Sequence, residues 1–400
     1  MHDFDFYTPT YIHFGHDAEL AAGAMVRRFG GSHVLLVSGG QSARRSGLLD
    51  RVEASLAQEN IACTRFEGAQ PNPLLSHAQA GVEAARQAGA DFILAVGGGS
   101  VIDTGKAIAH GLANPGADLW AIWTGKLPLE RTTPLGVVLT IPAAGSEMSN
   151  SAVLTNSALL TKRGLSTDLN RPKFALIDPA LALTLPWYQK ACGITDILLH
   201  TMERYFNPVW DNDTTYALAE ALLRTVIQNG RALRADPQDL HAMSEITWCG
   251  SLSHNDLTGL GGKKDFATHQ LGMAIGAVYD VAHGATLSAT WGSWARYVLP
   301  QGPALFARYA RNVWGISEPE ENAAALAGIR ATEDYFASLG MPIRLGQMEL
   351  HGQRLPAFGA EALDRLAEVC SFGGTRTIGS FQKLDRTDIR SIYEAANRPD

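Results

Sequence analysis

The sequence predicts an α/β domain built on a parallel sheet over residues 1–187, followed by an all-α domain over residues 188–400. Three observations lead to this prediction. First, a chain of 400 residues, 46% of them hydrophobic, exceeds what one compact core usually holds. Second, the first half alternates short apolar runs with segments of helical periodicity. Third, strand-like runs nearly disappear in the second half.

The apolar runs of the first half are too continuous in Ile, Leu and Val for a sheet with one face in water. The run HVLLVSGG, at 33–40, precedes a segment in which Leu49, Val52 and Leu56 recur at helical spacing. This alternation predicts a parallel sheet with helices on both faces. Strands are expected at 33–40, 61–68, 91–100 and 133–146, and helices at 46–60 and 74–90.

The second half is predicted to be helical. Helices are expected at 190–206, 213–235, 240–258, 303–314, 320–339 and 358–370. We find no internal repeat and no low-complexity linker in the chain. The helical domain is expected to begin near residue 188, because the strand-like runs nearly disappear after the stretch at 173–187.

Composition and charge exclude several classes of protein. The net charge is −7 and no basic run exceeds two residues, which argues against nucleic acid as a general partner. No window approaches 18 uninterrupted apolar residues, so no membrane span is expected. The first residues carry acidic groups where an export signal carries basic ones. The cysteines, Cys63, Cys192, Cys249 and Cys370, are scattered without a CxxC pair, which is typical of free, packed thiols in the cytoplasm.

A glycine turn follows the strand expected at 91–100. Residues 97–99 are all glycine, and they precede a helical pattern that contains Ser100 and Asp103. Glycines let a backbone approach a phosphate, and a helix N-terminus offers free N–H groups to it. Neither GxxxxGK[ST] nor GxGxxG is present, so a tight turn without a ligand remains the alternative.

A second glycine turn ends the strand expected at 33–40. Ser38-Gly39-Gly40 is followed by Ser42 and the pair Arg44-Arg45, with no carboxylate before Asp50. A dinucleotide site that accepts a 2′-phosphate is basic and lacks the acidic residue that binds a free ribose hydroxyl. If this turn meets the adenosine ribose, NADP(H) is favoured over NAD(H); the alternative is a pair of solvated arginines.

Four residues form a candidate metal site. Asp196 and His200 are four residues apart in a helical pattern, so both side chains face the same way. His269 and His283 lie in apolar, small-residue surroundings. Together they offer three nitrogens and one oxygen, which suits Zn or Fe(II) with an open position for substrate. Spacing does not choose between these metals, and hydrogen-bonded core histidines are the alternative.

These motifs, taken in order, resemble those of the iron-containing (group III) alcohol dehydrogenases, and most of all the branch of butanol dehydrogenases and NADPH-dependent aldehyde reductases. The matching stretches are GGGSVIDTGKAIA, LTIPAAGSEMSNSAVLT, DPALALTLP, GITDILLHTME, ATHQLG and AHGATLS. The resemblance implies a Rossmann-like dinucleotide-binding α/β domain, a helical metal-binding domain and a homodimer. It also implies that Asp196, His200, His269 and His283 are the metal ligands. It further implies nucleotide contacts from Gly39, Gly40, Ser42, Asn72, Gly98, Gly99, Ser100, Asp103, Thr140, Ser146 and Lys162.

One position departs from the family pattern. Many members carry a second histidine four residues after the third metal ligand, where this chain has Met273. A thioether transfers no proton, so we expect water or the cofactor ribose to carry the proton instead.

The predicted activity is hydride transfer between NADP(H) and a small alcohol or aldehyde, with one divalent metal as Lewis acid and no catalytic side chain besides its ligands. A sugar-phosphate cyclase-type lyase is one alternative. The segments around the metal positions, 192–206 and 265–290, carry few basic residues for a phosphorylated substrate. A protein that binds nucleotide or metal without turnover is the other alternative.

Overall fold

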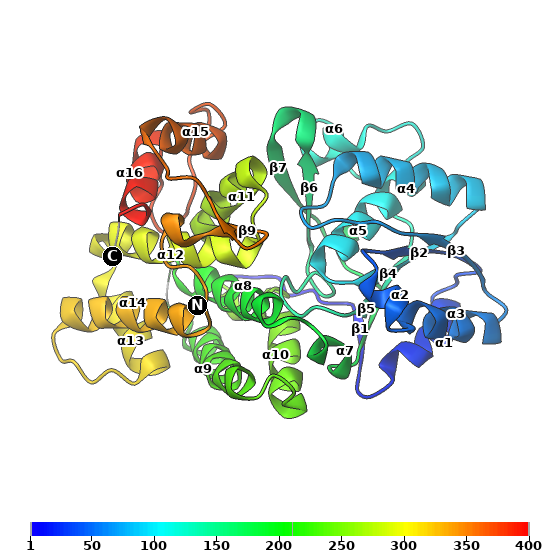
Figure 1. Ribbon diagram of the computed structural model, residues 1–400, viewed down its shortest axis with the longest axis horizontal. Coiled ribbons are helices and arrows are strands. Elements are labelled where there is room, and N and C mark those ends of the chain that lie inside the picture. Colours follow the sequence, from blue (N-terminus) through cyan, green and yellow to red (C-terminus); the bar gives the residue numbers. More distant parts are fainter. Residues whose placement is uncertain (1, 210, 399–400) are drawn as a thin grey trace. The chain divides into compact units, whose positions relative to one another are not determined.

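The computed structural model describes residues 2–209 and 211–398, and its chain divides into two compact units (Figure 1). Residues 7–184 form an α/β unit, and residues 185–400 together with the first six residues form a helical unit. The predicted fold class, a parallel-sheet α/β domain plus a helical domain, is confirmed.

The α/β unit is built on one six-stranded sheet in the order β1-β8-β5-β4-β2-β3. Every neighbouring pair is parallel, as in the register Val34↔Phe92 between β2 and β4. The strands are β1 (Tyr11–Phe14), β2 (His33–Ser38), β3 (Ala62–Phe66), β4 (Phe92–Gly97), β5 (Leu135–Leu139) and β8 (Phe174–Ile177).

Alternating side chains of these strands enter two separate cores, as the predicted two-sided burial requires. In β2, Leu35 and Val37 pack in one core while Val34 and Leu36 pack in the other. Figure 1 shows helices on the two faces of the sheet. One face carries α4 (Leu75–Ala88), α5 (Gly99–Ala113) and α6 (Leu119–Trp123), and the other carries α1 (Ala22–Arg28) and α3 (Leu48–Gln58).

An antiparallel hairpin and the sheet strands β1 and β8 were not predicted. The hairpin consists of β6 (Ser151–Asn156) and β7 (Thr161–Ser166), and β6 packs against α5. The edge strand β1 is largely exposed and lacks the apolar run that marks a buried strand. The unit also contains the short helices α2 (Ser42–Arg45) and α7 (Ala180–Leu183).

The helical unit contains α8 (Trp187–Tyr205), α9 (Asp213–Ala235), α10 (Leu240–Ser253), α11 (Ala267–Tyr279), α12 (His283–Val298), α13 (Pro303–Trp314), α14 (Glu321–Ser338), α15 (Ala360–Cys370) and α16 (Arg386–Ala396). The helix predicted at 240–258 ends earlier, at Ser253, and Asp256 has a positive φ of 82° that no regular helix accepts. Among the described residues of this unit, the exception to the all-α prediction is a pair of antiparallel strands of two residues each, β9 (Glu349–Leu350) and β10 (Gln353–Arg354).

Large aromatic side chains fill the core of the helical unit. Trp291 and Trp294 are fully buried, and Phe206 stacks on Phe306 with ring centroids 4.3 Å apart. Helix α8 packs against α9, α10, α11 and α12, so most of its residues are buried. Among the described residues, no helix combines the length and the apolar character that crossing a bilayer demands. All four cysteines are free thiols.

Candidate metal centre and nucleotide-binding loops

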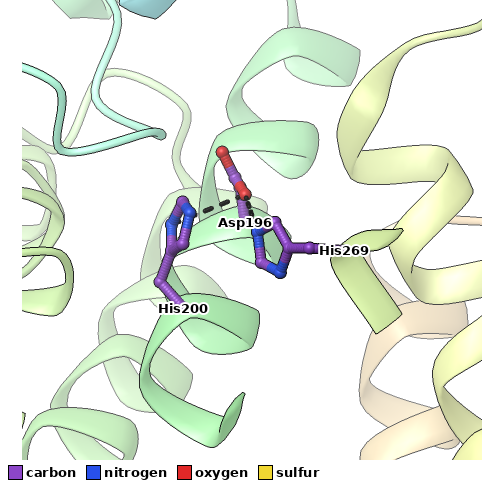
Figure 2. A group of neighbouring side chains, drawn as sticks. All are labelled: Asp196, His200 and His269. Atoms are coloured by element: carbon purple, nitrogen blue, oxygen red, sulfur yellow. Dashed lines mark ion pairs between the residues drawn. The ribbon is translucent and has the colours of Figure 1, made fainter. Parts of the chain in front are cut away.

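Helices α8, α11 and α12 bring the four predicted metal ligands together. The Oδ1 atom of Asp196 lies 3.6 Å from Nδ1 of His200 and 3.4 Å from Nε2 of His269. Nε2 of His283, the first residue of α12, lies 3.8 Å from the same oxygen. Figure 2 shows Asp196 and His200 on one helix and His269 approaching from another. Three nitrogens therefore converge on one carboxylate oxygen.

The geometry fits a cation. Asp196, His200 and His269 are each less than 9% exposed. One ligand atom of each residue has no hydrogen-bond partner: Oδ1 of Asp196, Nδ1 of His200 and Nε2 of His269. A buried polar atom left unsatisfied costs about 1–3 kcal/mol. One divalent ion among these atoms would satisfy all three, and nitrogen and carboxylate oxygen are ligands that Zn and Fe(II) accept.

The two buried histidines differ in their pKa values. Burial lowers the pKa of His200 well below its usual value, and neighbouring His254 and His269 lower it further. Burial also acts to lower the pKa of His269, but the charge of Glu203, its hydrogen bond to the ring and the nearby Asp196 carboxylate raise it to about 9. The carboxylate of Glu203 is thus the main electrostatic neighbour of the His269 ring.

Sequence reasoning missed two residues beside this cluster, Glu203 and His254. Glu203 accepts a short hydrogen bond from Nδ1 of His269, and the ring of His254 packs against that of His200 in a tilted arrangement, with ring centroids 4.1 Å apart. The ring of Phe266 also packs on that of His269, with ring centroids 5.2 Å apart, and Phe266 has a positive φ of 55°. Glu203 had a signal in the sequence, since it follows Asp196 by seven residues and so lies on the same helix face.

The first glycine turn joins β4 to α5, as predicted. Gly98 is the residue before the helix, and a Cβ on it would lie 2.8 Å from Ile141. A Cβ on Gly99 would lie 2.8 Å from Cβ of Ala144. Packing against the segment after β5 therefore requires these glycines even before any ligand is considered. Ser100, in the first turn of α5, is partly exposed.

Asp103 and Ser146, two predicted nucleotide contacts, bond to each other. Ser146 Oγ donates to Asp103 Oδ1 at 2.6 Å, and the Val153 amide donates to Oδ2 at 2.8 Å. Lys106, which sequence reasoning missed, donates to Ser146 Oγ at 2.8 Å and to the Ser151 carbonyl at 2.7 Å. Burial lowers the pKa of Lys106 to about 8. This polar cluster joins α5 to the hairpin strand β6.

Two other predicted contacts, from distant parts of the α/β unit, are neighbours. Lys162 on β7 donates from Nζ to Oδ1 of Asn72 at 2.9 Å. Asn72 has a positive φ of 57°, which asparagine tolerates in a turn. The amide of Thr140, just past β5, donates to the Gly97 carbonyl at 3.1 Å and so connects that strand end to the first glycine turn.

The second glycine turn has a carboxylate beside it in space. Gly39 and Gly40 follow β2, and Ser42 begins the short helix α2. The Gly39 carbonyl accepts from the Gly68 amide at 3.1 Å, which brings the end of β3 alongside the turn. Glu67, just past β3, forms a short ion pair with Arg44. The chain has no acidic residue between this turn and Asp50, but the fold places the carboxylate of Glu67 beside the turn.

Comparisons with known proteins agree with this architecture. The family described as "Iron-containing alcohol dehydrogenase" matches residues 9–179, and the "Fe-containing alcohol dehydrogenase family, C-terminal" matches residues 190–397. The NADH-dependent butanol dehydrogenase A of Clostridium acetobutylicum is 35% identical, over 98% of this chain and 99% of the relative. The NADPH-dependent aldehyde reductase YqhD of Escherichia coli is 33% identical, over 99% and 100%.

Solved structures are similar over the full length as well. The crystal structure of NADH-dependent butanol dehydrogenase A from Thermotoga maritima has a TM-score of 0.94 at 32% identity and covers 100% of this chain and 99% of its own. That of Escherichia coli YqhD has a TM-score of 0.91 at 30% identity, with 99% coverage of each chain. The chain therefore belongs to the iron-containing alcohol dehydrogenase family, in the branch of the butanol dehydrogenases and YqhD, and it is an oxidoreductase of the alcohol dehydrogenase and aldehyde reductase type.

Proposed function

We propose that this enzyme is a metal-dependent, NADP(H)-preferring alcohol dehydrogenase that works as an aldehyde reductase on small substrates. The observation that carries the proposal is the group of three buried ligand atoms without hydrogen-bond partners, on Asp196, His200 and His269. Hydrogen-bonded core histidines, the alternative for this cluster, would have paired these atoms.

The proposed metal ligands are Asp196, His200, His269 and His283, and the ion is Fe(II) or Zn. When bound, the ion supplies Lewis acidity to an alcohol or aldehyde oxygen, a contribution of several kcal/mol. Asp196 supplies the negative charge, and His283, with a side chain 30% exposed, is the most accessible of the set. The burial of the other three keeps competing water away from their side chains.

The α/β unit is proposed to bind the coenzyme at the carboxyl ends of its strands, where open parallel sheets bind ligands. The N-terminus of α5 offers backbone N–H groups to a pyrophosphate. The proposed contacts are Gly39, Gly40, Ser42, Asn72, Gly98, Gly99, Ser100, Asp103, Thr140, Ser146 and Lys162. Asp103 and Ser146 act in this proposal by holding α5 and β6 together.

The preference for NADP(H) rests on this chain's own residues, because its relatives include both NADH-dependent and NADPH-dependent enzymes. Arg44 lies in the first helix after the second glycine turn and has a side chain 51% exposed. A guanidinium at that place suits a 2′-phosphate.

Proton delivery has no assigned side chain. Met273 lies one helical turn after His269 on α11 and is partly exposed, but a thioether neither donates nor accepts the proton. Water or a ribose hydroxyl is proposed to carry it.

A direct experiment is to load purified protein with Fe(II) or Zn and add NADPH with a panel of short aldehydes. We expect loss of the nicotinamide absorbance with metal and none after chelation. NADH measured in parallel should support slower turnover. Metal-loaded protein that oxidises neither coenzyme with any aldehyde would contradict the proposal.

A cytoplasmic location and a homodimer complete the proposal. The four free thiols support a reducing compartment. The edge strand β1 exposes Tyr11 and Phe14, each 40% exposed, as a surface for a second copy. Light scattering of the purified protein gives its oligomeric state directly.

A further inference from the structure

Glu203 is a fully buried carboxylate next to the proposed metal centre. It lies on α8, three residues after His200 and seven after Asp196, the two proposed ligands of that helix. Its side chain is 0% exposed. Burying a charge at such a place is costly unless hydrogen bonds compensate it.

Both carboxylate oxygens of Glu203 bond to His269. Oε1 accepts from the backbone amide of His269 at 3.1 Å, and Oε2 accepts a short hydrogen bond from ring atom Nδ1. The backbone carbonyl of Glu203 also accepts from the Asp265 amide at 2.8 Å. Glu203 therefore fixes both the start of α11 and the rotation of the His269 ring.

The hydrogen bond also sets the tautomer of that ring. An ionised carboxylate only accepts hydrogen bonds, so the shared proton belongs to Nδ1 of His269. With the proton on Nδ1, atom Nε2 of a neutral ring has a lone pair. That atom is the one that lies 3.4 Å from Asp196 and has no hydrogen-bond partner.

We infer that Glu203 is a positioning residue of the metal centre, which holds His269 as the Nδ1–H tautomer and turns Nε2 toward the ion. The inference rests on the proposed function, since it presupposes that His269 binds a metal. Carboxylates that orient ligating histidines typically contribute 10–100-fold to metal affinity. Helix α8 would then supply two ligands and the group that orients a third.

The substitution Glu203→Gln separates positioning from packing. Glutamine has nearly the same shape, but it has one acceptor oxygen and one donor NH₂ group, so it cannot accept both hydrogen bonds from His269. A matched control is Glu333→Gln. Glu333 is another buried glutamate of the helical unit, and it forms ion pairs with Arg296 and Arg344, neither of which is a proposed ligand.

The test is a titration of the chelator-stripped proteins with Co²⁺, followed by visible absorption and by competition with a chelator of known affinity. We expect Glu203→Gln to weaken Co²⁺ binding about 10–100-fold and to change the absorption bands. Glu333→Gln should lower thermal stability while leaving Co²⁺ affinity and the spectrum as in the parent protein.

Each outcome has one meaning. If the parent protein binds Co²⁺ and Glu203→Gln binds it equally well, the role of Glu203 is refuted while the metal centre stands. If the parent protein binds no Co²⁺, the metal centre and the inference both fall.

A second measurement does not depend on the variant's folding. In the Zn-loaded parent protein labelled with ¹⁵N-histidine, the ring signal that disappears in His269→Gln should show a proton on Nδ1. A proton on Nε2 instead would overturn the inference.

Discussion

Each unit of the chain contains a buried cluster of charged and polar side chains, and the two clusters differ in how their atoms are paired. In the α/β unit, Asp103 and Lys106 are both bonded to Ser146 and to backbone groups of β6 or its approach. In the helical unit, Asp196 and two histidines face one another with three atoms left without partners. Composition alone would not separate the two.

The difference in hydrogen-bond pairing indicates that the two clusters have different functions. A buried polar network whose bonds are all made within the protein stabilises one arrangement of its elements. A cluster with unpaired atoms costs free energy until a ligand completes it. We therefore interpret the first cluster as support for the nucleotide-binding loops and the second as a ligand site. Variants that alter one cluster at a time test this difference.

The largest effect is expected from Asp196→Ala. Removing the single anionic ligand should abolish metal binding and lower kcat/KM about 10⁴-fold, or about 5 kcal/mol, because Lewis acidity is lost with the ion. Stability of the metal-free protein should not fall, since an unpaired buried carboxylate is removed. Metal analysis, steady-state kinetics and thermal unfolding check the three parts. The control is Asp334→Ala, which removes an exposed carboxylate of the same unit. If Asp196→Ala retained the metal content of the parent protein, the proposed metal site would be refuted.

Lys106→Met is expected to lower stability without affecting metal binding, the reverse of Asp196→Ala. This change leaves the buried Asp103 without its nearby cation, and breaking a buried charge pair costs about 4 kcal/mol. The loss should appear in the unfolding of the α/β unit, while the metal content of the protein stays the same. Lys126→Met makes the same change at an exposed position and should cost less than about 0.5 kcal/mol. Equal destabilisation by both variants would contradict the support role.

A titratable group in the same unit offers a finer test, because it is paired only with neutral partners. His110, fully buried on α5, bonds through Nε2 to Oδ1 of Asn170 at 2.8 Å and through Nδ1 to Oγ1 of Thr132 at 2.9 Å. The Asn170 amide nitrogen already donates to two carbonyls, so Oδ1 accepts and His110 Nε2 carries the proton. Burial lowers the pKa of His110 from 6.5 to about 4.

The third prediction follows from the sign of that shift. As pH falls below 6.5 the unfolded chain takes up the proton first, so His110 should reduce stability progressively until about pH 4, where the folded ring is also protonated. The total loss is about 3 kcal/mol. The difference in unfolding free energy between the parent protein and His110→Gln, measured across this window, isolates the effect. A difference that does not vary with pH would refute it.

The fold class was predictable because buried parallel strands require continuous apolar runs, as in β2 and β4. The strands β1 and β7 were missed because they lack such runs, and β6 was missed because its apolar run is limited to residues 152–154. The helix pair Asp196 and His200 followed from spacing, because four residues make about one turn.

The rest of the site was not derivable from local pattern. His269 and His283 are distant in sequence from Asp196, so ligand chemistry and the family resemblance could suggest one set, but only the structure brings the four residues together. A carboxylate such as Glu203 on a helix face resembles a solvated residue until its burial is known. The pairing of Arg44 with Glu67 depends on β3 lying beside β2 in the sheet, and local sequence pattern does not determine strand order.

The smallest effect is expected from the ion pair between Arg44 and Glu67, which lies closer to the surface than either buried cluster. Glu67 competes with a 2′-phosphate for Arg44, so Arg44→Ala should lower the NADPH to NADH ratio of kcat/KM about tenfold, or about 1.4 kcal/mol. Glu67→Gln should raise the ratio, because it releases the guanidinium. Steady-state rates with NADPH and NADH measure this ratio. The control is Arg45→Ala, which removes the neighbouring exposed arginine. A ratio that responds equally to Arg44→Ala and Arg45→Ala would mean that only general positive charge matters and that the pair selects nothing.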